Sequence, residues 1–147
     1  MYFSLVDRVL EVSSDAGATL KVVSMAEEYL QDHFPSFPVL PGVLMLEAMV
    51  QTCREVAWAR GIEEPLVLGQ VRALKYNRFV QPGYSIRTCV KLTKADDQIG
   101  ELVFKCTVEL VDPVAVSGDA TSSQADQPVV AASGRITLRP VKTAMPL

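Results

Sequence analysis

DHFPSFPVLPGVLMLEAMVQTCREVAWAR, which spans Asp32 to Arg60, joins a proline-rich loop to the longest apolar run of the chain that can form a helix. His33, the only histidine, stands at the start of the loop. The three prolines that follow it fix the backbone φ angle and push the preceding residues towards extended conformations, which predicts a stiff loop. Good helix formers then continue without proline or glycine until Gly61, so a helix is expected from about Val43 to Arg60. Apolar residues cover most of its circumference, which is typical of a helix buried in a core.

Three polar residues lie on one face of this predicted helix. Glu47, Gln51 and Arg54 follow one another at i, i+4 and i+7. Taken alone, this spacing is typical of a narrow solvent-exposed stripe, and a single loop histidine is typical of a structural role. Neither feature by itself indicates a function.

The order of residues across the loop and the helix is more specific than any pair within it. The positions concerned are His33-Phe34-Pro35, Pro38-Val39, Pro41-Gly42-Val43-Leu44, Glu47-Ala48-Met49 and Gln51. In this order they resemble the signature of the FabZ-type β-hydroxyacyl-acyl carrier protein dehydratases, which have the hotdog fold. Residues 5–10 (LVDRVL) also resemble the first strand of that family, and residues 78–83 (RFVQPG) resemble the turn after its third strand. The resemblance covers most of residues 3 to 112.

The resemblance implies a reaction and assigns roles. Water is removed from a 3-hydroxyacyl thioester by a base that takes the α-proton and an acid that protonates the departing β-hydroxyl. His33 would be the base, since histidine exchanges protons near neutral pH. Glu47 would be the acid, and its place on an apolar helix is expected to keep the carboxyl protonated. The backbone N–H groups of Gly42 and Val43, at the helix N-terminus, would stabilise the thioester oxygen. No cofactor and no metal are implied.

The same resemblance implies partners. In this family the histidine and the glutamate of one site come from different subunits, so a homodimer with two shared sites is expected, with further association into a trimer of dimers. The substrate would arrive on the phosphopantetheine arm of an acidic acyl carrier protein. Contacts with it are expected from Arg72, Lys75 and Arg78, for which a solvated strand face is the alternative explanation.

Other residues have two open interpretations. Gln51 would orient the Glu47 carboxylate, or it is simply polar on the same helix face. Phe34 and Phe37 would line the acyl tunnel, or they belong to the core. Asp32, Ser36, Phe37 and Tyr84 depart from the family's usual residues, which places the substrate range in question. Two other functions therefore compete: a hotdog acyl thioesterase, and a non-catalytic subunit that binds acyl carriers.

Composition bounds the remaining function classes. With 147 residues the chain is expected to form one domain, residues 1–147, and its net charge of −3 disfavours nucleic acid or an anionic membrane surface as a partner. Polar residues break the apolar run near Met1 early, so no signal peptide is predicted and a cytoplasmic location is expected. Cys53, Cys89 and Cys106 are expected to be buried free thiols, because their spacing fits neither a zinc site nor a disulfide framework.

The remaining segments predict an antiparallel sheet. Strands are expected at residues 1–11, 19–25, 66–79, 85–93, 101–111 and 129–138, with a turn at 15–18 and a short helical segment at 26–31. Basic residues at three-residue spacing indicate a bulge within 66–79. Residues 112–127 are expected to form a flexible loop and 140–147 a frayed tail. The fold class is therefore α+β, with a hotdog arrangement of one sheet wrapped around one long central helix.

Overall fold

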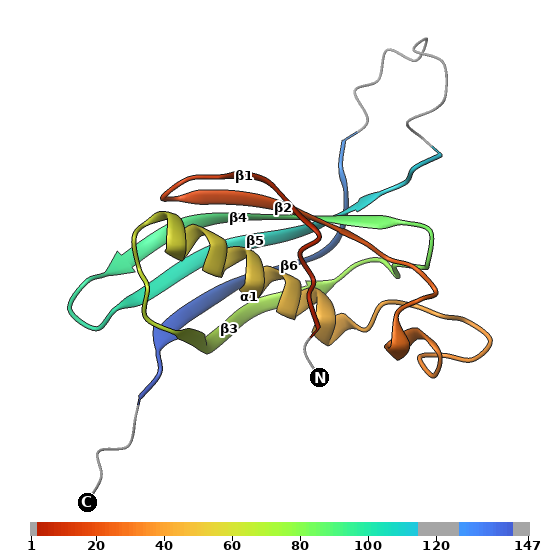
Figure 1. Cartoon of the computed structure of the whole chain (residues 1–147), viewed down its shortest axis with the longest axis horizontal. Coiled ribbons are helices and arrows are strands. Elements are labelled where there is room, and N and C mark those ends of the chain that lie inside the picture. The colour runs from red at the N-terminus through yellow and green to blue at the C-terminus, as the bar shows by residue number, and fades with distance from the viewer. Residues whose placement is uncertain (1–2, 115–126, 143–147) are drawn as a thin grey trace, which may run out of the picture.

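One long helix, α1 (Gly42–Ala59), lies across one face of an antiparallel sheet (Figure 1). The computed structural model describes residues 3–114 and 127–142, and within them the sheet has six strands. The strands are β1 (Arg8–Val12), β2 (Ala16–Val22), β3 (Leu66–Tyr76), β4 (Ser85–Asp96), β5 (Glu101–Val111) and β6 (Val129–Pro140), and a short 3₁₀ helix, η1 (Glu28–Leu30), precedes α1. Their order across the sheet is β1-β2-β4-β5-β6-β3. This confirms the expected α+β class. β4, β5 and β6 form a meander, whereas β3, which the sequence placed before β4 in a meander of consecutive strands, lies beside β6 instead.

The core lies between α1 and the sheet. Ala48, Met49, Cys53 and Val56 of the helix are completely or almost completely buried, as is Phe104 of β5. Because these helix residues follow one another at spacings of one, three and four, they form the broad apolar face that the sequence predicted. The helix begins and ends one residue before the expected bounds.

The first hairpin differs from the prediction at both ends. β1 begins at Arg8 and not at residue 1, and the turn lies at Ser13–Asp15, where Ser13 Oγ donates to Asp15 Oδ1 at 2.8 Å. Ala16, Gly17 and Ala18, expected to form the turn, belong to β2. A Cβ atom added to Gly17 would lie 2.9 Å from Val56 Cγ2. Small residues stand here because the helix packs closely against β2, and not because the chain turns.

Strand β3 is bulged, as expected, and lies at the edge of the sheet. Its pairing with β6 shifts between Leu68 and Gln70 and again between Arg72 and Lys75. β3 has no neighbour on its other side within the described residues. It ends at Tyr76, three residues before the predicted end.

The later strands are as long as expected or longer. β5 has the predicted bounds, whereas β4 continues to Asp96 and β6 to Pro140. Pro140 is therefore part of the sheet and not of a frayed tail. The predicted loop at 112–127 falls largely on residues 115–126, and most of the predicted tail on 143–147, which lie outside the described residues.

Two of the three cysteines meet in the core. Cys53 of α1 and Cys106 of β5 are buried, with their sulfur atoms 3.7 Å apart. Burial raises the pKa of the Cys53 thiol, and the hydrogen bond with Cys106 acts in the same direction, so the thiolate is disfavoured. Cys89 is only half-buried, so the expectation of three buried thiols is wrong for this residue.

Candidate active site

His33 is fixed by the loop that follows it. Its ring nitrogen Nδ1 donates to the carbonyl of Val39 at 2.9 Å, and the Val39 N–H donates to the His33 carbonyl at the same distance. The next residue, Leu40, donates its N–H to the Val80 carbonyl at 2.8 Å. Val39 and Leu40 are buried, so they anchor the end of the loop in the core while His33 stays half-buried at its start.

The hydrogen bond to Val39 determines which nitrogen of His33 is basic. A carbonyl oxygen only accepts, so Nδ1 must carry the proton. In the neutral imidazole Nε2 is then the nitrogen with the free electron pair. The loop therefore presents His33 as a base through Nε2.

His33 lines a pocket of about 380 Å³. The lining comes from three segments that are far apart in the sequence, namely the loop (His33, Phe34, Val39, Leu40), the start of α1 (Gly42, Met45) and the end of β3 with the residues after it (Tyr76, Asn77, Arg78, Phe79). Apolar and aromatic groups dominate, with a few polar groups, as is usual for a ligand site.

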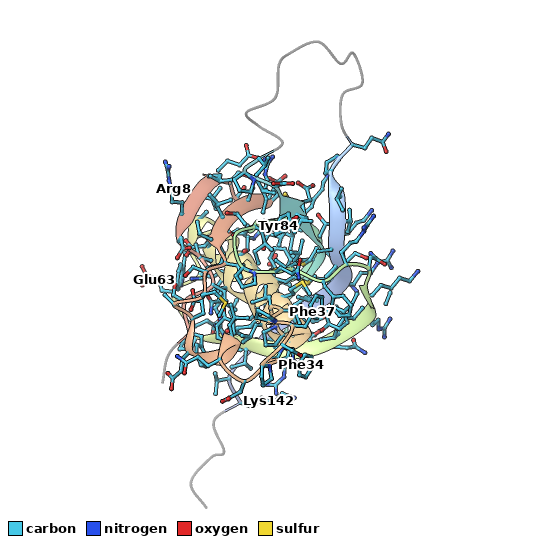
Figure 2. The ribbon with its side chains drawn as sticks, turned by 90° about the vertical axis from the view of Figure 1, so that its right-hand side faces the viewer. Arg8, Phe34, Phe37, Glu63, Tyr84 and Lys142 are labelled. Carbon is cyan, nitrogen blue, oxygen red and sulfur yellow. The ribbon has the colours of Figure 1, made fainter. Side chains whose placement is uncertain are left out.

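Aromatic rings gather at this end of the molecule. The rings of His33 and Phe34 are stacked with centroids 4.2 Å apart, and Phe37 meets Phe79 edge to face at 5.7 Å. Phe34 and Phe37 point from the same loop at the end of the molecule that faces the viewer in Figure 2. Phe34 lines the pocket, whereas Phe37 contributes through its contact with Phe79.

The N-terminus of α1 brings free backbone donors to the pocket. Pro41 at the N-cap provides no side-chain acceptor, and Leu44 is the first residue whose N–H bonds back to the Pro41 carbonyl, at 3.0 Å. The N–H groups of Gly42 and Val43 thus have no acceptor within the helix. Gly42 lines the pocket, but Val43 does not, and its side chain is exposed.

Gly42 is also the point where the helix approaches Tyr76. A Cβ atom added to Gly42 would lie 3.0 to 3.3 Å from three atoms of the Tyr76 ring. We expect Gly42→Ala to lower kcat/KM by about ten- to a hundredfold, because the displaced ring enters the pocket and misplaces the substrate. The melting temperature should change little, since alanine favours the helix and Tyr76 is half-exposed and free to turn. Gly42→Ala combined with Tyr76→Ala is the control: if removing the ring recovers none of the lost activity, this explanation is wrong.

Glu47 lies outside the pocket of its own protomer. Its side chain is 41% exposed, it accepts a hydrogen bond from Gln51 Nε2 at 3.2 Å, and it lies 3.9 Å from Arg54. The polar face predicted from the i, i+4, i+7 spacing is therefore present. The expected burial of Glu47 is not present within one protomer, and His33 and Glu47 of one chain do not line a common pocket.

Gln51 does more than the sequence suggested. Its Oε1 accepts the N–H of Leu5 at 2.8 Å, and its Nε2 donates to the Phe3 carbonyl at 2.8 Å as well as to Glu47. Gln51 is buried. The side chain thus fastens the segment before β1 to the helix and positions the Glu47 carboxylate at the same time.

We expect Gln51→Leu to destabilise the protein by about 1–3 kcal/mol, because the buried N–H of Leu5 and the partly buried carbonyl of Phe3 lose their partner. Urea unfolding would measure the change. Gln51→Glu is the matched variant, since it keeps the acceptor for Leu5 and loses both donors. A Gln51→Leu protein as stable as the wild type would contradict the structural part of this role.

The remaining predicted residues separate into two groups. Arg78 lines the pocket, whereas Arg72 and Lys75 are exposed on β3 away from it. The other residues of the lining were not assigned to the site from the sequence: Val39, Leu40, Met45, Tyr76, Asn77 and Phe79. The spacing of Met45 after Gly42, one helical turn, was the one available signal.

Within the part of the chain that the structure describes, no helix is long and apolar enough to cross a membrane.

Comparison with known proteins identifies dehydratases as relatives of this chain. The family model described as ApeI-like, ApeI dehydratase, matches residues 11–119. The 3-hydroxyacyl-[acyl-carrier-protein] dehydratase FabZ of Bartonella bacilliformis is 37% identical over 112 residues, which cover 74% of this chain and 71% of the relative. The FabZ protein of Streptococcus suis is 35% identical over 119 residues, which cover 80% of this chain and 84% of the relative.

Solved structures agree on the fold. The dehydratase heterocomplex ApeI:P from Xenorhabdus doucetiae has a TM-score of 0.67 at 17% identity and covers 95% of this chain and 84% of that one. An acyl-CoA hydrolase from Agrobacterium tumefaciens has a TM-score of 0.60 at 14% identity and covers 86% of this chain and 43% of that one. At these identities the likeness concerns the fold alone, and it confirms the hotdog arrangement.

Proposed function

The chain belongs to the ApeI-like dehydratase family and is a relative of the FabZ-type 3-hydroxyacyl-[acyl-carrier-protein] dehydratases, and on this basis we propose how its residues perform the reaction. The protein is a hydro-lyase that converts 3-hydroxyacyl thioesters to trans-2-enoyl thioesters in fatty acid biosynthesis. We propose His33 as the base and Glu47 as the acid. The observation that carries this proposal is the hydrogen bond from His33 Nδ1 to the Val39 carbonyl, which leaves Nε2 basic beside the pocket.

The proposed reaction uses these groups in turn. His33 Nε2 takes the proton from the α-carbon, and the electron pair of that C–H bond forms the double bond as the bond between the β-carbon and the hydroxyl oxygen breaks. The carboxyl of Glu47 gives its proton to the hydroxyl, which leaves as water. Charge that builds on the thioester oxygen is stabilised by the N–H of Gly42, with that of Val43 as a second donor, at the positive end of the helix dipole. The proton on His33 then passes back to the Glu47 carboxylate through solvent.

We propose that the acid of each site comes from a second subunit. The pocket around His33 has no carboxylate in its lining. The free edge of β3 is 11 residues long, and long exposed edges pair readily with another strand. On α1, Val43 is 69% exposed and Trp58 is 58% exposed, which leaves apolar surface for a partner helix. A homodimer would cover the edge of β3 and the apolar surface of α1, and would bury Glu47. Light scattering, which gives the mass in solution, would distinguish a dimer from a trimer of dimers.

We propose an acyl carrier protein as the source of the substrate. The relatives are named for acyl carrier protein substrates, and Arg78 stands in the pocket lining, where it can meet the phosphate of a phosphopantetheine arm.

We also propose a cytoplasmic location. It fits the free thiols of Cys53 and Cys106, which lie close together without forming a disulfide.

Turnover of 3-hydroxyacyl and trans-2-enoyl thioesters, followed at the enoyl absorbance, tests the proposal. Interconversion of the two confirms the dehydratase. Release of free thiol without enoyl formation would indicate an acyl thioesterase, and binding of acyl ligands without turnover would indicate a non-catalytic subunit.

A further inference from the structure

Four basic side chains stand directly opposite one another across four strands. Lys91 of β4 pairs with Lys105 of β5, Lys105 pairs with Arg135 of β6, and Arg135 pairs with Arg72 of β3. All four are exposed, on the face of the sheet that points away from α1. We call these residues the basic ladder. Since neighbouring strands lie about 4.8 Å apart, the ladder is about 14 Å long.

The basic ladder is unfavourable for the isolated protomer. Like charges at directly opposite positions of a sheet repel each other and destabilise the pairing. None of the four residues forms an ion pair with a carboxylate of the described residues, whereas Lys21, Arg54 and Arg87 do. The fold therefore keeps an uncompensated row of positive charge.

The second bulge of β3 adds a fifth charge to this face. From Arg72 to Lys75 the chain advances three residues while β6 advances only two, from Arg135 to Ser133. Without the extra residue, alternation would turn Lys75 towards the core. The bulge places Ala73 at φ 51°, in the left-handed region that alanine adopts only at a cost. Lys75 instead lines a hollow of about 180 Å³ together with Lys105, Ser133 and Arg135.

We propose that the basic ladder and Lys75 form the docking surface for the acyl carrier protein, an inference that rests on the proposed function. An acidic α-helix with a carboxylate at each turn repeats every 5.4 Å or so, close to the strand spacing of the ladder. The pocket follows directly along the chain from this surface, because Lys75 precedes Tyr76, the last residue of β3, and both Tyr76 and Arg78 line the pocket.

The charge distribution favours a protein helix over a larger polyanion. The whole chain has a net charge of −3, so a long nucleic acid or an anionic membrane meets a repulsive overall field. A single docked helix would lie within about 10 Å of the basic ladder, which is the distance over which salt screens charges. The helix would therefore interact mainly with the ladder and much less with the acidic residues elsewhere on the protein.

The test compares two variants that make the same change in net charge. The ladder variant carries Lys105→Glu and Arg135→Glu. The control carries Arg8→Glu and Lys142→Glu, at two exposed cations outside the ladder (Figure 2). Each protein is assayed on a 3-hydroxyacyl chain attached to holo acyl carrier protein and on the same chain attached to N-acetylcysteamine.

The ladder variant is expected to raise KM for the carrier-linked substrate by about tenfold or more, with kcat unchanged. Its turnover of the N-acetylcysteamine thioester should equal that of the wild type, and the control should match the wild type on both substrates. Added NaCl should raise KM for the carrier-linked substrate in the wild type and much less in the ladder variant.

Two outcomes would overturn the docking surface: an unchanged KM for the carrier-linked substrate, or an equal loss on both substrates, which would place the effect in the fold. If the wild type turns over neither substrate, the dehydratase proposal fails instead. Calorimetric titration with holo acyl carrier protein then decides the docking question, and equal binding by wild type and ladder variant would overturn it.

Discussion

His33→Ala is expected to lower kcat/KM for dehydration by about 10²- to 10⁴-fold, the range usual for a lost acid–base group. The reason is the loss of Nε2, the nitrogen left basic by the hydrogen bond to the Val39 carbonyl. The rate is measured at the enoyl absorbance with a saturating and a low concentration of substrate. Both kcat and kcat/KM should fall, because proton abstraction occurs in the transition state.

His33→Asn separates the base from the loop. The asparagine amide nitrogen can take the place of Nδ1 and donate to the Val39 carbonyl, but asparagine has no basic nitrogen. This variant should keep the melting temperature of the wild type and be as inactive as His33→Ala. Substantial activity in His33→Asn would mean that His33 holds the loop and is not the base.

Glu47→Gln is expected to lower kcat by about 10²- to 10⁴-fold, because the amide cannot give a proton to the leaving hydroxyl. Glutamine keeps the size of the side chain and can still bond to Gln51, so the stability should change little. Arg54→Gln is the matched control, since it removes the neighbour at 3.9 Å without touching the carboxyl. Wild-type activity in Glu47→Gln would remove this residue from the reaction.

Mixing the two inactive proteins tests whether a site is shared between subunits. In a mixed dimer of His33→Ala and Glu47→Gln chains, one of the two sites has both mutations and the other has neither. Random re-association should therefore restore about a quarter of the wild-type activity. No recovery, with exchange of subunits demonstrated by two different tags, would contradict a site built from two chains.

Local pattern predicted the central elements well. The helix between Gly42 and Ala59 has a broad apolar face and no internal breaker, and β5 alternates cleanly, so both have nearly the expected bounds. The position of His33 at the head of a proline loop was also predictable. These features depend on residues that are close together in the sequence.

The errors occur where distant residues decide the local structure. The segment before Arg8 has the composition of a strand, but Phe3 and Leu5 bond to Gln51, 48 and 46 residues away. Among the described residues of this segment, Asp7 alone donates its N–H to β2, at the Leu20 carbonyl. Gly17 and its alanine neighbours suggest a turn, but they are small because Val56 packs against them. Neither contact leaves a signal in local periodicity.

The pocket was only half predictable for the same reason. His33, Phe34 and Gly42 belong to the motif, whereas Tyr76 and Phe79 come from an element more than thirty residues further along the chain. The spacing of Glu47, Gln51 and Arg54 indicated a solvent-exposed stripe, and Glu47 is exposed, but the burial of Gln51 under the segment before β1 had no signal in the helix. Periodicity in the sequence shows which residues share a face of the helix, whereas the packing of other segments determines which of these faces is buried.

The buried pair of Cys53 and Cys106 also allows the opening of the core to be followed over time. A thiol reagent reaches the half-buried Cys89 directly. It reaches Cys53 and Cys106 only when α1 moves away from β5. Labelling should therefore proceed in two phases, a fast one for Cys89 and a slow one in which Cys53 and Cys106 react together. The rate of the slow phase gives the rate at which α1 separates from β5. It can be measured on the same sample as the activity, because no labelling site has to be introduced.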